Sequence, residues 1–412
     1  MNYLIIGNSS AAIGAVEAIR KQDTTSSITL ISDEPYHTYG RPLISYWLEG
    51  KVSDDKIYYR PMDFYEKNDC NLILGTKVTA IDAKAKVVKL EDTSTIAYDK
   101  LLIATGSRAF VPPMPGLEKV ENKFSFMKYD DAKAIKAALK KDSKVLIIGA
   151  GLIGLKAAEG IAQTSSDITV VDLADHILPS ILDCEAAQIV QKHIETQGVQ
   201  FILNDKVVHF DESTATLASG KSIPFDLVIV AVGVRPNVEL AKEAGLEVNR
   251  GIILDENCKT SDPHIYAAGD CTESIDLTTG EQKILALLPN AYIQGEVAGT
   301  CMAGVEKTYT RAIPMNAIGF FGLHMITAGT YDGEATVLSS TGSFKKLVFK
   351  DGLLKGYIMI GDVKRAGIYT SLIKEEIPVS KVDLNLLSSQ PQMLFFDKPR
   401  RLEKLGGIYN EN

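Results

Sequence analysis

Two apolar runs in this chain are each followed by a glycine, a few small residues and the start of a helical pattern. Leu4 to Ile6 leads into Gly7, and Val145 to Ile148 leads into Gly149. A buried strand, a tight turn and a helix N-terminus form the arrangement that receives a dinucleotide pyrophosphate, because backbone N–H groups at the helix start face the anion. Two such turns in one chain predict two dinucleotide sites.

The strand and helix patterns that follow the two turns repeat each other. Ser27–Asp33 corresponds to Ser166–Asp172, and Tyr98–Arg108 corresponds to Phe225–Asn237, where an aromatic residue and an Asp precede the apolar run. The chain therefore carries an internal duplication. Alternating strands and helices in both halves imply an α/β fold with two parallel-sheet, three-layer domains of the Rossmann-like type.

From about Arg311 the pattern changes to alternating strands. Phe344–Phe349 and Leu353–Ile360 flank the turn Asp351-Gly352, and this arrangement predicts a third, α+β domain. The tail from Ile377 onward is predicted to be polar and irregular.

Other stretches predict single strands and a boundary. Val78–Leu90 alternates apolar with polar residues, and Gly251–Leu254 is a short apolar run, so each predicts one strand. The cluster of helix and strand breakers from Pro112 to Gly116 marks a domain boundary.

Composition excludes several classes of function. The 412 residues carry a net charge of −8, which argues against nucleic acid or an anionic membrane as the main partner. No stretch reaches the roughly 18 uncharged apolar residues that a membrane span needs. The five cysteines form no CxxC pair, which is typical of reduced thiols in a cytoplasmic protein, and we expect no metal site.

The second turn carries the complete glycine pattern. Gly149, Gly151 and Gly154 have the GxGxxG spacing. Asp172 follows the next predicted strand, where a carboxylate accepts hydrogen bonds from ribose hydroxyls. No arginine follows Asp172 directly, so a 2′-phosphate would meet negative charge. This pattern favours NADH over NADPH.

The first turn departs from that pattern. Gly7 is followed by Ser9 and Ala12 at the positions of the second and third glycines. Taken alone, an ordinary strand-to-helix turn explains this stretch equally well. Asp33 and Glu34 come just after the second strand, where a ribose hydroxyl lies in a dinucleotide fold.

Three later motifs occur in a fixed order with the two turns. They are Ala104-Thr105-Gly106, Gly233 to Asn237 and Ala267 to Asp270. With them the chain resembles, from residue 1 to about 370, the two-dinucleotide-binding flavoprotein family of pyridine-nucleotide-dependent oxidoreductases. The resemblance implies FAD on the N-terminal block and NAD on the inserted middle block. It implies an FAD-binding domain at 1–110 and 238–310, an NAD-binding domain at 111–237, and a C-terminal α+β interface domain with its tail at 311–412.

The site residues follow from the turns and from the family motifs. In the family, the aspartate of the AxGD motif, here Asp270, contacts the ribityl chain of FAD, and the helix near Asn290-Ala291 points its N-terminus at the flavin carbonyl. The residues expected to bind FAD are Gly7, Ser9, Ser10, Ala11, Ala12, Asp33, Glu34, Arg41, Pro42, Val78, Ala104, Thr105, Gly106, Arg108, Gly269, Asp270, Asn290 and Ala291. The residues expected to bind NAD are Gly149, Gly151, Leu152, Ile153, Gly154, Asp172 and Gly233.

The loop from Tyr39 to Ser45 discriminates among members of this family. Disulfide reductases, peroxidases and coenzyme A disulfide reductases carry a redox cysteine in this region, and this loop has none. Its YxRPxxS pattern looks like that of rubredoxin reductases, ferredoxin reductases and the flavin part of nitrite reductases. Arg41 can neutralise a pyrophosphate, and Pro42 offers a flat apolar face near the flavin. Without a dithiol relay, electrons must leave the flavin directly.

Lys156 departs from the family pattern, and Cys271 is a candidate redox group. Relatives often carry a glutamate beside the nicotinamide where this chain has Lys156. Lys156 either lies near the flavin or pairs with Glu159 on one helix face, since the two are three residues apart. Cys271 follows Asp270, but a lone buried cysteine is more often a small apolar residue.

These features predict an FAD-dependent NADH oxidoreductase that exchanges electrons with rubredoxin or a small iron–sulfur protein. One alternative is an NADH oxidase or diaphorase that uses oxygen or a quinone. Another is a flavoprotein subunit or redox sensor, for which the third domain and the basic cluster Lys398–Arg401 are candidate docking surfaces. A solvated tail explains the same cluster. A homodimer and a complex subunit both stay open.

Overall fold

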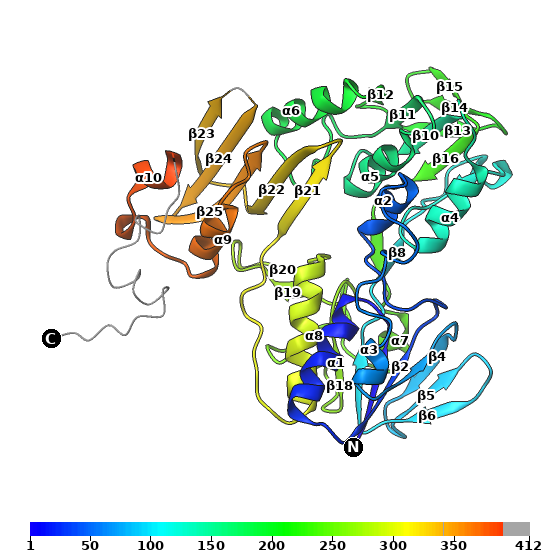
Figure 1. The fold of residues 1–412 in the computed structure, drawn as a ribbon, viewed down its shortest axis with the longest axis vertical. Helices are drawn as coiled ribbons and strands as arrows, with labels where there is room; N and C mark the ends of the chain where they lie inside the picture. The colour runs from blue at the N-terminus through cyan, green and yellow to red at the C-terminus, as the bar shows by residue number, and fades with distance from the viewer. Residues whose placement is uncertain (341, 390–412) are drawn as a thin grey trace. The chain divides into compact units, whose positions relative to one another are not determined.

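A computed structural model of the chain describes residues 1–340 and 342–389 (Figure 1). The predicted basic cluster Lys398–Arg401 lies outside these described residues. The chain divides into two compact units. Unit 1 comprises residues 1–178, 194–275 and 281–312, and unit 2 comprises residues 179–193, 276–280 and the described residues from 313 onward.

The first sheet of unit 1 is parallel and has the strand order β18-β7-β1-β2-β3. Its strands are β1 (Asn2–Ile6), β2 (Ser27–Ile31), β3 (Cys70–Ile73), β7 (Lys100–Ile103) and β18 (Ile265–Ala267). β1 lies between β2 and β7, with Ile6 opposite both Ile31 and Ile103. Strand β18 follows every strand of the second parallel sheet in the sequence, yet it pairs with β7 in the first sheet. The first sheet is therefore built from two separate segments of the chain.

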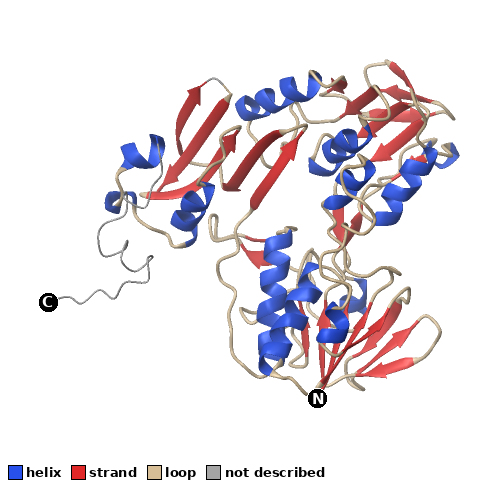
Figure 2. Cartoon of the chain, in the orientation of Figure 1, coloured by secondary structure: helices blue, strands red, loops and turns tan. Residues whose placement is uncertain are grey.

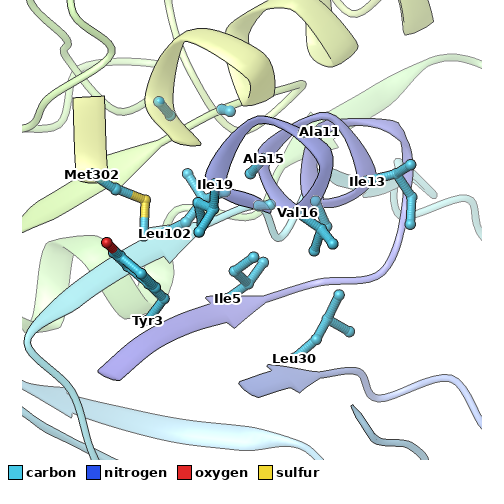
Figure 3. Close-up of a cluster of buried hydrophobic side chains, with 14 of the residues drawn as sticks. Tyr3, Ile5, Ala11, Ile13, Ala15, Val16, Ile19, Leu30, Leu102 and Met302 are labelled. Atoms are coloured by element: carbon cyan, nitrogen blue, oxygen red, sulfur yellow. The ribbon is translucent and has the colours of Figure 1, made fainter. Parts of the chain in front are cut away.

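Helices α1 (Ser10–Gln22) and α8 (Leu288–Met302) lie side by side against this sheet (Figure 1). Glycines allow the close approach: a Cβ on Gly295 would lie 1.9 Å from the Ala11 carbonyl oxygen. Apolar side chains fill the space beneath α1 and include Ile5 and Leu30 from the sheet and Ala15, Val16 and Ile19 from the helix (Figure 3). The packing of α8 thus fixes the position of α1, whose N-terminus follows the first glycine turn.

The second sheet of unit 1 repeats this plan with the order β12-β11-β10-β16-β9, again parallel. Its strands are β9 (Lys123–Phe124), β10 (Lys144–Ile148), β11 (Asp167–Val171), β12 (Val199–Ile202) and β16 (Leu227–Val230). Helix α5 (Leu152–Ile161) follows the second glycine turn, and α4 (Tyr129–Ala138) precedes β10. The predicted pair of α/β layers is confirmed.

Small elements complete unit 1. The antiparallel sheets are β4 (Val78–Asp82), β5 (Val87–Leu90) and β6 (Thr95–Ala97); β13 (Val207–Phe210), β14 (Thr214–Leu217) and β15 (Ser222–Pro224); β8 (Ser107–Ala109) and β17 (Val234–Pro236); and β19 (Ser274–Ile275) and β20 (Gln282–Lys283). The short helices are α2 (Leu43–Leu48), α3 (Phe64–Lys67), the 3₁₀ turn Leu117–Lys119 and α7 (Glu239–Glu243).

Unit 2 is built on an antiparallel sheet of order β21-β22-β25-β24-β23, drawn in red in Figure 2. The strands are β21 (Met315–Phe320), β22 (Leu323–Gly329), β23 (Glu334–Ser340), β24 (Ser343–Lys350) and β25 (Leu353–Ile360), and the helices are α9 (Ala366–Lys374), α10 (Leu384–Ser389) and most of α6 (Cys184–Glu195). Tyr357 and Tyr369 fill its core. The predicted α+β character and the turn at Asp351-Gly352 are confirmed.

Three local predictions are wrong. Val78–Leu90 is a hairpin of two strands, and the chain reverses near Lys86, whose φ is +53°. Gly251–Leu254 forms no strand: Ile252 makes isolated bridges only, so its apolar character reflects burial in the core. The stretch after Ile377 contains a 3₁₀ turn (Val379–Lys381) and α10.

Candidate dinucleotide-binding and redox site

The three glycines of the second turn lack side chains for different reasons. Gly149 has φ +109°, and a Cβ there would lie 2.3 Å from the Ala231 carbonyl oxygen. A Cβ on Gly154 would lie 2.0 Å from the Gly149 carbonyl oxygen. At Gly151 a Cβ would meet no atom within 4 Å. The fold therefore requires glycine at positions 149 and 154, whereas Gly151 leaves open space beside the helix start.

The polar groups around this space suit a dinucleotide. Gly151 caps α5 and contributes no side chain, so the N–H groups of the first turn, which have no intrahelical acceptor, face outward. Asp172 follows β11, and its two oxygens accept hydrogen bonds from the backbone N–H groups of Ala150 (2.6 Å) and Ala174 (2.8 Å). These bonds fix the carboxylate beside the turn and leave each oxygen a lone pair for a ribose hydroxyl.

The first turn has the same construction with different residues. Gly7 has φ +120°, and a Cβ there would lie 2.1 Å from the Ala104 carbonyl oxygen. Ser9 caps α1 without a side-chain hydrogen bond to the helix, so the amides of the first turn, including those of Ser10, Ala11 and Ala12, are not used by the cap. Here too the structure fits an anionic group at a helix N-terminus.

The two glycine turns differ in the residue that follows the neighbouring strand, β2 for the first turn and β11 for the second. The N–H of Gly7 donates to Ile31 as that of Gly149 donates to Val171, so the counterpart of Asp172 is Ser32. The sequence pattern did not identify Ser32, because this register is visible only once the strands are paired. The predicted acids lie one and two residues later.

Those two acids already have partners in the chain. Asp33 is exposed and pairs with Lys128 at 3.0 Å. Glu34 is buried, accepts a hydrogen bond from Tyr39 at 2.6 Å, and forms an ion pair with Arg41 at 2.5 Å. Their contact with a ribose stays a prediction.

The three later motifs meet beside the first turn. Thr105 donates its hydroxyl to the Asn237 carbonyl, and the Asn237 amide donates to the Thr105 carbonyl, both at 2.8 Å. Strands β8 and β17 extend this contact as an antiparallel pair. A Cβ on Gly269 would lie within 3.5 Å of the Cβ atoms of Ala11 and Ala291. The AxGD motif therefore lies where α1 and α8 both begin, and α8 begins at Leu288, two residues before Asn290.

Asp270 is held among polar groups next to this junction. The Ser107 hydroxyl donates to its carboxylate at 2.9 Å. Burial raises the pKa of Asp270, and this effect exceeds the opposing effects of Ser107 and of the charge on Arg41. Arg41 also donates to Tyr39 Oη and to the Met127 carbonyl, both at 3.2 Å. The charge of Arg41 therefore acts on Asp270 of the AxGD motif.

Pro42 and Lys156 lie at the start of α2 and on the second turn of α5, respectively. Pro42 is the N-terminal cap of α2 and is exposed. Lys156 forms the ion pair with Glu159 that their spacing predicts. Cys271 is fully buried, and burial raises the pKa of its thiol, so it is held as an uncharged thiol in the core.

We call the two glycine turns with the helix starts that follow them the first cradle (residues 7–12) and the second cradle (residues 149–154). The remaining predicted site residues range from buried to exposed. Val78 is buried in the same apolar cluster as Ile31. Arg108 is exposed and pairs with Glu239 at 2.6 Å. Four residues are at least partly exposed: Gly106 and Gly233 have positive φ with no atom within 4 Å of an added Cβ, and Leu152 and Ile153 form the first turn of α5.

The structure adds an aromatic and charged cluster that the sequence indicated only as an aromatic-rich loop. Tyr129 on α4 packs edge-on against Tyr36 and Trp47, and its hydroxyl donates to Asp54 at 2.7 Å. The Trp47 indole donates to the same carboxylate at 2.5 Å. This cluster joins α2, which follows Arg41 and Pro42, to α4 of the second block.

Comparison with known proteins gives the family of this fold and site. The family model for pyridine nucleotide-disulphide oxidoreductases matches residues 1–295, more than half of the chain. The chain belongs to this family. It is therefore an oxidoreductase that acts with a pyridine nucleotide.

Three relatives show how varied the activities within this similarity are. The chain is 30% identical to the NADH-dependent phenylglyoxylate dehydrogenase subunit epsilon of Aromatoleum evansii, over 94% of each protein. It is 36% identical to an NADH oxidase of Methanocaldococcus jannaschii, over 75% of this chain and 71% of that protein. It is 32% identical to the rubredoxin-NAD(+) reductase of Pseudomonas putida, over 74% of this chain and 81% of that protein.

Longer relatives and a solved structure complete the comparison. The chain spans only about half the length of the nitrite reductase [NAD(P)H] of Bacillus subtilis, 48% of that protein. Its fold matches a putidaredoxin reductase in a covalent complex with putidaredoxin with a TM-score of 0.87 and 26% identity, over 94% of this chain and 96% of that chain. Within the described part of this chain, no helix is long and apolar enough to cross a membrane.

Proposed function

We propose that this protein is an FAD-dependent NADH oxidoreductase that passes electrons between NAD(H) and a small rubredoxin-type or iron–sulfur protein. The observation that carries the proposal is the presence of two glycine turns, each followed by a helix N-terminus, in one compact unit, with no cysteine in the loop from Tyr39 to Ser45. A rubredoxin reductase among the relatives and a putidaredoxin reductase among the structures of the same fold support the choice of acceptor.

We assign FAD to the first cradle and NAD to the second. The first cradle is surrounded by the Arg41 loop and the AxGD motif, which supply a cation and a carboxylate for a long ligand. The second cradle has Asp172 fixed by two backbone amides, and exposed Leu173 in place of a basic side chain after it. This combination supports NAD rather than NADP.

Bound FAD would supply the chemistry, because a flavin accepts a hydride from a nicotinamide and returns the two electrons singly. The residues of the chain bind and orient the cofactors. The N-termini of α1 and α5 bind the two pyrophosphates, and Gly151 leaves room for one of them. Glu34 and Tyr39 hold Arg41 in place beside the first cradle. Orientation of two bound reactants is worth several orders of magnitude in rate.

The domain arrangement that we propose follows from these assignments. Residues 1–110 and 238–310 would form the FAD-binding domain, 111–237 the NAD-binding domain, and 311–412 the C-terminal domain. Support comes from β18, which joins the sheet of β1 although it follows the whole second sheet in sequence. The cytoplasm stays our predicted location.

Two relatives support a second candidate each. The NADH oxidase relative favours direct reaction of the reduced protein with oxygen. The phenylglyoxylate dehydrogenase subunit matches this chain over nearly its full length and favours a role as the NADH-linked subunit of a larger oxidoreductase.

Steady-state assays with competing acceptors test the proposal. The purified, FAD-loaded protein is given NADH and either rubredoxin, a [2Fe–2S] ferredoxin or dissolved oxygen, and the rates are compared. We expect reduction of one of the two protein carriers to be at least about tenfold faster than oxygen consumption, because no cysteine intermediate stands between flavin and carrier. Fast oxygen consumption with no carrier reduction would favour the oxidase instead.

A further inference from the structure

Lys156 lies on α5 at its contact with α2. Helix α5 begins directly after Gly151 of the second cradle, and α2 begins directly after Arg41 and Pro42, beside the first cradle (Figure 1). The two helices are in close contact, since a Cβ on Gly160 of α5 would lie 3.1 Å from the Ser45 carbonyl oxygen of α2. Lys156 is on the second turn of α5, between Gly151 and Gly160, and its ammonium group lies over the Tyr46 ring of α2.

The ammonium group of Lys156 is fixed rather than solvated. Its Nζ lies 4.2 Å from the centre of the Tyr46 ring on α2, and it forms an ion pair with Glu159. The side chains of Lys156 and Glu159 are only 12% and 4% exposed. A second pair, Lys51 with Glu49 at 2.5 Å, lies at the end of α2, and there the lysine is 59% exposed. Lys156 is therefore a largely desolvated cation at the junction of the two helices.

This position matters because of where the nicotinamide must go, and this step rests on the proposed function. If NAD binds at Gly151 and the flavin lies near Arg41 and Pro42, the nicotinamide must cross the junction of α2 and α5 to meet the flavin. A nicotinamide ring carries one positive charge when oxidised and none when reduced. A fixed cation at the junction therefore interacts differently with the two redox states.

We propose that Lys156 is a specificity-determining residue that discriminates against the oxidised nicotinamide, and that Glu159 moderates this discrimination. Two like charges several ångströms apart in a partly buried site repel each other, and the nearby carboxylate of Glu159 offsets part of that repulsion. Reduced nicotinamide is neutral and binds without the penalty. Lys156, offset in part by Glu159, thus favours entry of NADH and release of NAD⁺.

Nucleotide affinities of single variants test the proposal. The FAD-loaded, oxidised protein is titrated with NAD⁺ and with 1,4,5,6-tetrahydro-NAD, which is uncharged at the ring and donates no hydride. Lys156→Met should tighten NAD⁺ binding by about 3- to 10-fold and change tetrahydro-NAD binding by less than about twofold. Glu159→Gln, which removes the negative charge that Glu159 supplies beside Lys156, should weaken NAD⁺ binding instead.

Two further variants keep the result interpretable. Lys156→Arg retains the charge and should keep the wild-type ratio of the two affinities. Lys67→Met removes an exposed cation that pairs with Asp63 on helix α3, and it serves as the matched control, with both affinities unchanged. If Lys156→Met does not fold, the weakening expected for Glu159→Gln still tests the sign of the effect.

The outcomes separate this inference from the proposed function. Equal shifts for both nucleotides, or shifts in the same direction for Lys156→Met and Glu159→Gln, would show a merely structural role and overturn the inference alone. Failure of the FAD-loaded wild-type protein to bind either nucleotide would overturn the proposed function and the inference with it.

Discussion

The three glycines of the second cradle differ in whether the fold alone requires them. Gly149 and Gly154 are fixed by backbone atoms that lie within 2.3 Å of any added Cβ, whereas Gly151 has open space beside it and an ordinary φ of −80°. If the turn served only the fold, a residue with a side chain would be accommodated at position 151 without a clash or backbone strain. The open space beside Gly151 is what a bound phosphate would fill.

Gly151→Ala should therefore leave the fold intact and weaken the binding of NADH. We expect a change in unfolding free energy of less than about 1 kcal/mol, because alanine at this φ is not strained. We expect NADH affinity to fall at least about tenfold, because the methyl group occupies the space for the phosphate. Thermal unfolding and nucleotide titration measure the two effects separately.

Gly149→Ala is the contrasting variant. Its Cβ collides with the backbone of Ala231, so stability and binding should fall together. If Gly151→Ala bound NADH as tightly as the wild type, the second cradle would not hold the pyrophosphate.

At the scale of elements, the contact between α1 and α8 positions the first cradle. The Gly295→Ala substitution would place a methyl carbon 1.9 Å from the Ala11 carbonyl oxygen and push the helices apart. We expect a loss of about 1–3 kcal/mol in unfolding free energy, as for other overpacked cores, and a lower FAD content after purification. Urea unfolding and the absorbance ratio of flavin to protein measure these effects.

Gly367→Ala provides the control, since this glycine is in helix α9 and has no atom within 4 Å of an added Cβ. It should keep the wild-type FAD content and match or exceed the wild-type stability. Normal flavin content in Gly295→Ala would show that α8 does not set the position of the first cradle.

A pH-sensitive carboxylate also links the same two helices, since Glu17 on α1 accepts a hydrogen bond from the Tyr292 hydroxyl on α8 and forms an ion pair with Arg60. Burial raises the pKa of Glu17 on α1, but hydrogen bonds from Arg60 and from Tyr292 on α8 outweigh it, so the pKa is lowered overall. A carboxyl whose folded-state pKa is lowered contributes stability above its unfolded pKa, about 4.5, and loses it as the pH falls through the folded value.

Glu17→Gln should consequently be less stable than the wild type at neutral pH and should lose less stability between about pH 5 and pH 3. Urea unfolding at a series of pH values measures this difference. Parallel stability curves for the two proteins over that range would contradict the assignment of acid sensitivity to Glu17.

At the scale of the whole molecule, the sequence predicted what repeats locally and missed what depends on pairing between distant segments. Both glycine turns, both parallel sheets and the ion pair of Lys156 with Glu159 follow from short-range patterns. The equivalence of Ser32 and Asp172 does not, because it depends on strand register. The contact of Lys156 with Tyr46 joins residues that lie far apart in the sequence, and no local pattern contains it.

The wrong strand predictions have a related cause. The run Gly251–Leu254 is apolar because Ile252 is buried, and burial alone does not distinguish a strand from a buried loop. The alternation in Val78–Leu90 continues through a reversal that contains no glycine or proline, so the pattern carried no turn signal.

The claim that reduced flavin in this protein delivers single electrons to an iron carrier is tested most directly by one anaerobic single-turnover measurement. The FAD-loaded protein is reduced with one equivalent of NADH and mixed with excess oxidised rubredoxin or [2Fe–2S] ferredoxin while the absorbance of the flavin and of the carrier is followed. The proposal predicts that two equivalents of one carrier are reduced per NADH as the flavin is reoxidised. A flavin that stays reduced in the presence of both carriers and is reoxidised only when oxygen is admitted would contradict it.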